Sequence, residues 1–162
     1  MFLKNFFTPV YIYHFLLFFS FSVSVNNQID ILYVNIFFYS LSHILIIYLS
    51  FYYFHSILFF VFLFYGSLYD IFLINEIGPH LIVFLFLLFF IMSLKKFLFN
   101  LSSLKVFYLI FLLILIIYFS EMIIADLFFK YSFNVSDYFL VSAISSITLI
   151  PIIFLFSKLD KI

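Results

Sequence analysis

Residues 66–80 read GSLYDIFLINEIGPH, a polar interruption in a chain that is otherwise almost continuously apolar. This stretch contains both glycines of the sequence, Gly66 and Gly78, followed by Pro79, together with two of the seven acidic residues. Glycine permits close helix contact or a positive φ, and proline removes a backbone donor and stops a helix. We therefore expect a turn between two helices here, and we expect the specific properties of the protein to depend on this segment.

The composition on either side of this stretch indicates an integral membrane protein. Hydrophobic residues make up 69% of the 162 residues and charged residues 9%, and the mean hydropathy is +1.37. A soluble domain carries about 25% charged residues. At about 20 residues per transmembrane helix, the length allows about six short spans in one membrane domain. The absence of cysteine excludes disulfides and thiolate sites, and the zero net charge without a basic run gives no indication of nucleic-acid binding.

Polar breaks divide the sequence into apolar runs that predict an all-α bundle. The apolar region 31–69 is 39 residues long, too long for one span at 1.5 Å per residue, so a turn must divide it between His43 and His55. The runs are continuous rather than alternating, which disfavours a β-barrel. The first run lacks a small-x-small cleavage site, so we interpret it as a helix rather than a signal peptide. We predict one domain over 1–162, with helices at about 9–25, 31–46, 52–69, 80–94, 104–127 and 138–156.

The lysines predict the orientation of this bundle. With six spans and the N-terminus inside, six of the seven lysines lie in cytoplasmic segments and only Lys130 lies outside. Lysine and arginine are enriched in cytoplasmic loops of membrane proteins, so both termini are expected in the cytoplasm. The six lysines are Lys4, Lys95, Lys96, Lys105, Lys158 and Lys161.

Asp70, Glu76 and His80 lie within eleven residues of one another and could converge on a cation or a proton. Ionisable residues inside a membrane are functional candidates by default. This stretch is expected at the outer interface, however, where a charge costs little. We therefore favour a solvated or partner-facing loop over a metal site.

The remaining ionisable residues receive structural interpretations. Glu121 and Asp126 are five residues apart, about 140° around a helix, so they do not share a face and are interpreted as a solvated helix end. The histidines His14, His43 and His55 are interpreted as bundle or interface residues rather than ligands.

The last predicted helix carries small polar residues and a proline. The pattern Ser142-x-x-Ser145-Ser146 is the best candidate for a helix contact face, because serine permits close approach and interhelical hydrogen bonds. Pro151 is expected to kink or end this helix near the cytoplasmic surface.

One short segment points to an enzyme. Residues 133–137, Phe-Asn-Val-Ser-Asp, resemble the Phe-Asn-x-Ala-Asp segment of signal peptidase II, a membrane aspartyl protease that needs two close carboxylates. The second aspartate of that family lies upstream in an Asn-x-x-Asp-Arg motif. Here Asn100 is followed by Leu-Ser-Ser and the chain has no arginine, so this resemblance is the weakest alternative.

Over about 130 residues the sequence resembles the MreD family, small membrane proteins of the bacterial rod-shape system. The family has an aspartate near the start of helix 2, a Gly-Leu-x-x-Asp motif ending helix 3, a Leu-Gly-x-His/Asn loop before helix 4, and a terminal proline with a basic tail. The matching positions are Asp30, Gly66-Ser67-Leu68-Tyr69-Asp70, Ile77-Gly78-Pro79-His80, and Pro151 with Lys158 and Lys161. Ile29 stands where the family has proline.

The resemblance implies a non-enzymatic, multi-pass protein of the bacterial inner membrane without cofactor, metal or catalytic residue. It would scaffold MreC, the MreB filament, and the wall glycosyltransferase and transpeptidase, in contact with membrane lipids and with homo-oligomerisation open. The implied partner-binding or structural residues are Gly66, Asp70, Glu76, Gly78, Pro79 and His80, with Asp30 and Pro151 as secondary positions.

A second class of function also fits six helices. The capture subunits of vitamin importers bind a small molecule in a polar, outward-facing pocket. In this chain such a pocket would be lined by Asp70, Glu76, Glu121 and Asp126.

Overall fold

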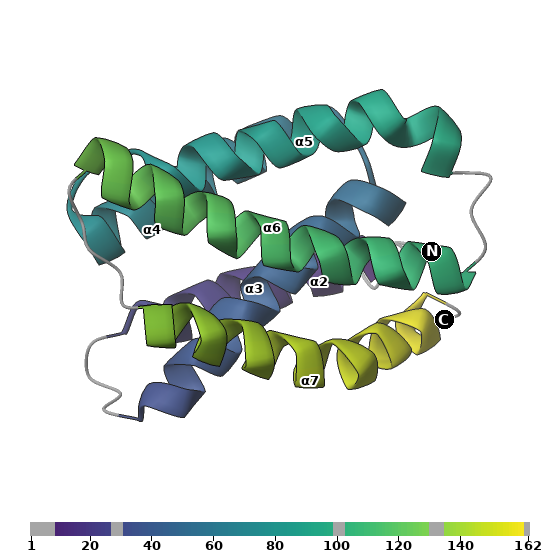
Figure 1. The fold of residues 1–162 in the computed structure, drawn as a ribbon. Coiled ribbons are helices and arrows are strands. Elements are labelled where there is room, and N and C mark those ends of the chain that lie inside the picture. The colour runs from purple at the N-terminus through teal and green to yellow at the C-terminus, as the bar shows by residue number, and fades with distance from the viewer. Residues whose placement is uncertain (1–8, 27–30, 99–102, 130–134, 161–162) are drawn as a thin grey trace.

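The computed structural model describes residues 9–26, 31–98, 103–129 and 135–160, and these residues form a bundle of six helices (Figure 1). The all-helical prediction is thereby confirmed for the described residues. The helices are α2 (Pro9–Ser24), α3 (Leu32–Tyr52), α4 (Ile57–Ile74), α5 (Pro79–Leu98), α6 (Ser103–Phe129) and α7 (Val135–Leu159).

Four of these helices are long and apolar enough to cross a membrane, namely α3, α4, α6 and α7, and the shorter segments Pro9–Ser24 and Pro79–Leu94 are also apolar. A helix needs about 20 residues to cross the hydrocarbon core. Large apolar side chains also cover the outside of the bundle, where Phe86 is 70% and Ile147 is 74% exposed. Such a surface is suited to lipid rather than water, and together these features indicate a multi-pass membrane protein.

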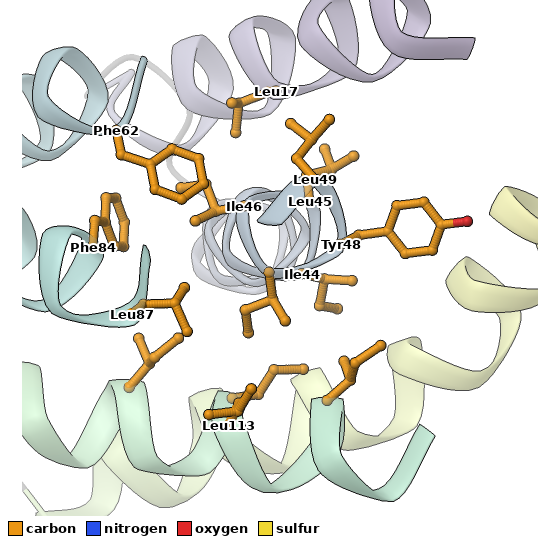
Figure 2. Packing of buried hydrophobic residues seen from close by; sticks show 14 of the residues in the cluster. Leu17, Ile44, Leu45, Ile46, Tyr48, Leu49, Phe62, Phe84, Leu87 and Leu113 are labelled. Atoms are coloured by element: carbon orange, nitrogen blue, oxygen red, sulfur yellow. The ribbon is translucent and has the colours of Figure 1, made fainter. Parts of the chain in front are cut away.

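Helix α3 lies at the centre of the bundle and packs against α2, α5, α6 and α7. Every residue from 42 to 50 is buried, the pattern of a helix that is covered on all sides. Figure 2 looks along α3 and shows its side chains directed outward to different neighbours: Leu49 towards α2, Ile46 towards α4 and α5, and Ile44 towards α6. The core is therefore organised around one helix rather than between two layers.

The helix boundaries differ from the predicted ones mainly around α3 and α4. The turn between them occupies residues 53–56, at the far edge of the predicted interval, and α3 runs to Tyr52 instead of residue 46. It continues because the residues beyond 46 still pack in the core, as Tyr48 and Leu49 do. Helix α4 continues to Ile74, where Asn75 takes the left-handed conformation (φ 61°) that ends many helices.

Helix α7 confirms one expectation and changes another. Ser142 and Ser145 are buried, and the Ser145 hydroxyl lies 2.6 Å from that of Ser40 on α3, so this face does contact a neighbouring helix. Pro151 lies inside α7, which continues to Leu159, so the proline does not end the helix.

Contacts of Asp160, which follows α7, show which parts of the chain share one end of the bundle. The carboxylate accepts hydrogen bonds from Tyr13, near the start of α2, and from Tyr53 in the α3–α4 turn. At the other end, Ser24 at the end of α2 lies 3.0 Å from the Tyr69 hydroxyl, late in α4. The start of α2, the α3–α4 turn and the end of α7 are therefore together.

Candidate functional site

The α4–α5 corner is built around the carboxylate of Asp70. Its Oδ2 accepts hydrogen bonds from the backbone N–H groups of Gly78 (2.8 Å) and Leu81 (3.0 Å), and its Oδ1 accepts one from that of His80 (2.9 Å). The first N–H groups of a helix have no partner within the helix and carry partial positive charge. Asp70 therefore anchors the start of α5 to α4 with charge-assisted hydrogen bonds.

Gly66 brings the two helices into backbone contact one turn earlier in α4. A Cβ atom at this position would lie 2.7 Å from the Cα and 3.0 Å from the N of Leu81. Real Cβ atoms do not approach backbone so closely, so only glycine fits. The expectation of close helix contact at Gly66 is confirmed. Gly78 does not adopt a positive φ, and its visible contribution is the N–H donated to Asp70.

A line of hydrogen bonds leads from this corner into the bundle. The His80 ring lies between Asp70 and Tyr39: its Nδ1 is 2.8 Å from Asp70 Oδ1 and its Nε2 is 2.9 Å from the Tyr39 hydroxyl. The Tyr39 hydroxyl is also 2.9 Å from Oε2 of Glu121. Three helices besides α4 thus contribute to one polar line, since these residues belong to α5, α3 and α6.

The line ends at His43, one turn after Tyr39 on α3. Its Nε2 is 3.0 Å from Glu121 Oε1, and its Nδ1 is 2.8 Å from the backbone carbonyl of Tyr39. Both His43 and Glu121 are buried. Each buried carboxylate thus has a histidine partner, which is how charged groups are tolerated inside a membrane protein. We refer to the partly buried Tyr39 together with the buried His43, Asp70, His80 and Glu121 as the buried polar cluster.

The cluster corrects two interpretations made from the sequence. Asp70 and His80 were expected on a solvated or partner-facing loop, but both are buried, because α4 continues past Asp70 and the carboxylate turns back to α5. Glu121 was expected at a solvated helix end, but it is 4% exposed, because its carboxylate bonds inward to Tyr39 and His43 of α3. Glu76 and Asp126 are exposed, as expected.

The sequence contained one signal for the pairing of His43 with Glu121, namely that an acid and a histidine both occur within apolar runs. His43 precedes Glu121 by 78 residues, so spacing along the chain could not show that they meet. The interpretation of His43 as a bundle histidine agrees with its burial.

Hydroxyl groups surround the cluster and tie it to the neighbouring helices. The Tyr69 hydroxyl lies 2.6 Å from that of Ser42, and the Tyr69 ring stacks on His80 with centroids 5.4 Å apart. The Tyr118 hydroxyl lies 2.9 Å from that of Ser145, and the Tyr118 ring stacks on Tyr39 with centroids 6.0 Å apart. The rings therefore hold Tyr39 and His80 in fixed orientations.

A second polar feature, the tyrosine clamp, consists of Tyr13, Tyr48, Tyr53 and Asp160. All three hydroxyls donate to the Asp160 carboxylate, the bond from Tyr13 being 2.6 Å long. Burial raises the pKa of Tyr53 well above its ordinary value, and the hydrogen bond and negative charge of Asp160 raise it further. Sequence reasoning missed this clamp, because tyrosines in an aromatic-rich chain were interpreted as packing residues.

The four carboxylates expected to line a ligand pocket do not all come together. Asp70 and Glu121 are bonded inside the bundle, whereas Glu76 on the α4–α5 turn and Asp126 on α6 are exposed. A groove of about 340 Å³ between α5 and α6 is lined by apolar side chains and Ser120. In the described part of the chain, no group of three or more His, Asp or Glu side chains is arranged to hold a metal ion.

Some predicted positions lie wholly or partly outside the described residues. Asp30 and the first two residues of the Phe-Asn-Val-Ser-Asp segment lie outside them, while Asp137 is exposed in the first turn of α7. Pro79 begins α5 and is buried.

Comparisons of the chain with protein-family models, with curated proteins and with solved structures found no match.

Proposed function

We propose that this protein is a scaffold subunit of the bacterial inner membrane, of the MreD type, that assembles MreC and the peptidoglycan synthases of wall elongation. In this role it performs no chemistry of its own. Its helices hold partners at fixed positions in the membrane, and its two termini lie in the cytoplasm.

The observation that carries the proposal is the interlocking of the residues on which the family resemblance rests. Gly66, Asp70, Gly78 and His80 form one unit that fixes α4 to α5 through backbone contact and three N–H bonds. Residues that line a ligand site would keep hydrogen-bonding capacity for the ligand, but the Asp70 carboxylate is fully used inside the protein. A rigid corner of this kind suits a protein that presents a surface.

The surface that this corner presents is the α4–α5 turn. Asn75, Glu76 and Ile77 are exposed there, directly above the buried Asp70. The α3–α4 and α4–α5 turns are short, so partner recognition must use these turns and the lipid-facing sides of the helices. Glu76 is the charged residue of the α4–α5 turn, and we assign it a direct role in docking, with Asp70 holding the turn in shape.

The test is crosslinking in native membranes, followed by purification of the tagged protein and mass spectrometry. Wild type is compared with Glu76→Lys, which changes the exposed turn, and with Asp126→Lys, a matched charge reversal at an exposed acid on α6. The proposal predicts recovery of MreC or the wall synthases with wild type and Asp126→Lys, and at least a several-fold loss with Glu76→Lys at equal protein level.

Other results would overturn parts of this proposal. Recovery of the ATPase and coupling subunits of an importer would favour the small-molecule capture function instead. Equal recovery of wall synthases with Glu76→Lys would move the docking surface away from the α4–α5 turn. Recovery of neither group of proteins from wild type would contradict the scaffold function.

A further inference from the structure

The hydrogen bonds of the buried polar cluster can be assigned by counting protons. Asp70 accepts four N–H bonds, two at each oxygen, which occupies its four lone-pair sites and leaves no room for a proton of its own. The His80 Nδ1 therefore carries hydrogen. The Nδ1 of His43 also carries hydrogen, because its partner is a backbone carbonyl, which only accepts.

Three hydrogen bonds remain between these fixed ends, and each needs one proton. They join His80 Nε2 to the Tyr39 hydroxyl, this hydroxyl to Glu121 Oε2, and Glu121 Oε1 to His43 Nε2, at 2.9, 2.9 and 3.0 Å. Three protons fill the three bonds in more than one way, because each of the joined atoms can either donate or accept.

Three arrangements satisfy every bond while Tyr39 keeps its own proton. In the first, both histidines are charged and Glu121 is ionised. In the second, Glu121 is neutral and donates to a neutral His43, and the positive charge is on His80. In the third, Glu121 donates to Tyr39, Tyr39 donates to a neutral His80, and the positive charge is on His43. With Asp70 negative, the net charge is zero in all three.

We propose that His80, Tyr39, Glu121 and His43 form a proton relay that moves a positive charge between the two histidines. In the transfer from the first arrangement to the third, the N–H bond of His80 breaks and its proton joins the Tyr39 oxygen, while the Tyr39 proton passes to Glu121 Oε2. In the transfer from the first to the second, the Nε2 proton of His43 passes to Glu121 Oε1. No proton is gained or lost, and no hydrogen bond has to be remade with a different partner.

The surroundings of the relay keep this exchange inside the protein. His43, His80 and Glu121 are 0%, 2% and 4% exposed. The titratable groups that face the relay come from four helices, namely Tyr39 and His43 of α3, Tyr69 and Asp70 of α4, His80 of α5, and Tyr118 and Glu121 of α6. Tyr69 and Tyr118 bond to serine hydroxyls, so the relay has its own separate line of bonds.

The two ends of the relay are not equivalent. The Asp70–His80 end lies directly beneath the exposed turn at residues 75–77, whereas the His43 end points at backbone within the centre of the bundle. The Asp70–His80 end is therefore the end of the relay nearer to the surface, and Glu121 and His43 form its deeper end. This assignment goes beyond the scaffold function and does not depend on it.

Nitrogen NMR of the ring atoms tests the relay, because protonated and bare ring nitrogens have different chemical shifts. The chain has only four histidines, so protein labelled with ¹⁵N-histidine in detergent gives few signals, and His14→Gln and His55→Gln assign two of them. The relay predicts that the Nε2 signals of His43 and His80 lie between the protonated and bare limits. It also predicts that they shift together with temperature, because temperature alters the populations of the three arrangements.

Tyr39→Phe removes the bridging hydroxyl and keeps the ring. We expect the joint shift to be lost, with the two histidines responding separately. Tyr118→Phe is the matched control, since it removes a neighbouring buried hydroxyl that is outside the relay, and the joint shift should remain. Glu121→Gln should also abolish the joint shift, because its amide cannot pass a proton on. This variant replaces Tyr39→Phe in the test if Tyr39→Phe lowers the yield of folded protein.

Two results would overturn the relay. The first is a wild type whose His43 and His80 signals lie at limiting values and respond independently. The second is a joint shift that survives both Tyr39→Phe and Glu121→Gln, in proteins whose helical content and unfolding transition match those of wild type.

Discussion

Gly66 and Leu81 are in backbone contact: a Cβ atom placed on Gly66 would lie 2.7 Å from the Cα of Leu81. The contact puts α4 and α5 close enough for Asp70, one turn later, to reach the N–H groups at the start of α5. The position of the glycine is therefore a condition for the hydrogen bonds of the carboxylate. It also means that replacing Gly66 by alanine should lower stability, whereas this change usually raises stability within a helix.

Gly66→Ala should destabilise the protein by about 1–3 kcal/mol, the usual cost of overpacking. In an ordinary helix interior the same change stabilises by about 0.5–1 kcal/mol, so the sign separates the two cases. The measurement is the unfolding free energy in detergent by denaturant titration. Ser67→Ala is the control, because Ser67 bonds only to its own helix at Leu63, and it should change stability little. A more stable Gly66→Ala variant would show that the two helices are not in contact.

Asp70→Asn should cost about 3 kcal/mol or more. The amide keeps one accepting oxygen but points an N–H group at the N–H donors of α5, and it leaves His80 without its charged partner. Hydrogen exchange should rise at the amides of Gly78, His80 and Leu81, which the wild-type carboxylate protects. Glu76→Gln, on the exposed turn, should leave both stability and exchange within error of wild type. Unchanged exchange in Asp70→Asn would refute the anchoring role.

Tyr53 should ionise at higher pH than an exposed tyrosine, because burial and the Asp160 carboxylate raise its pKa. An unfolded tyrosine has a pKa of about 10. Since the raised pKa belongs to the folded state, the stabilisation is complete below about pH 10 and is lost as the pH rises through the folded value. The measurement is the difference in phenolate absorbance between wild type and Tyr53→Phe during an alkaline titration.

Asp160→Asn tests how the Asp160 charge in the tyrosine clamp affects the pKa of Tyr53. Removing the negative charge should move the Tyr53 titration towards its ordinary range while burial keeps part of the shift. The variant should also loosen the end of α7, since the amide keeps only one accepting oxygen for the three tyrosine hydroxyls. A Tyr53 titration that is identical with and without the Asp160 charge would contradict this account.

A reporter fused after Ile162 should be active only in the cytoplasm. The lysine distribution predicts this side, and the tyrosine clamp puts the start of α2, the α3–α4 turn and the end of α7 at one end of the bundle. A second reporter inserted in the α3–α4 turn should therefore agree with the first. Activity of the terminal fusion in the periplasm alone would reverse the orientation, and disagreement between the two sites would contradict the shared end.

The helical organisation was predictable because hydropathy marks apolar runs and polar breaks separate them. The boundaries of α4 were less predictable, because Asp70 was interpreted as lying beyond the end of this helix, and the burial of Glu121 within α6 was not predicted. An acid inside an apolar run marks a helix end only when no partner neutralises it, and the partner of Glu121 is on another helix. Local sequence therefore misplaces those acids that tertiary contacts bury.

Of the candidate site residues, Gly66 and Asp70 were singled out by composition and clustering, but the burial of Asp70 was not predicted. The roles of His43 and Tyr39 were not, because a histidine or tyrosine in an aromatic-rich run has the same pattern whether it packs or bonds. Asp160 and Tyr13 are separated by 147 residues, beyond any spacing rule. A special need for glycine at 78 stays a prediction, since the N–H that Gly78 donates is one that any residue except proline has.

The central position of α3 has a consequence for biosynthesis. α3 leaves the ribosome before three of the four helices that cover it, and His43 meets Glu121 only after a further 78 residues have been made. Until then, the polar groups on α3 face lipid or the insertion machinery, where an unpaired polar group is costly. We therefore expect release of the nascent protein into the bilayer to wait for α6, and a chain stalled before Glu121 to remain bound to the machinery that inserts it.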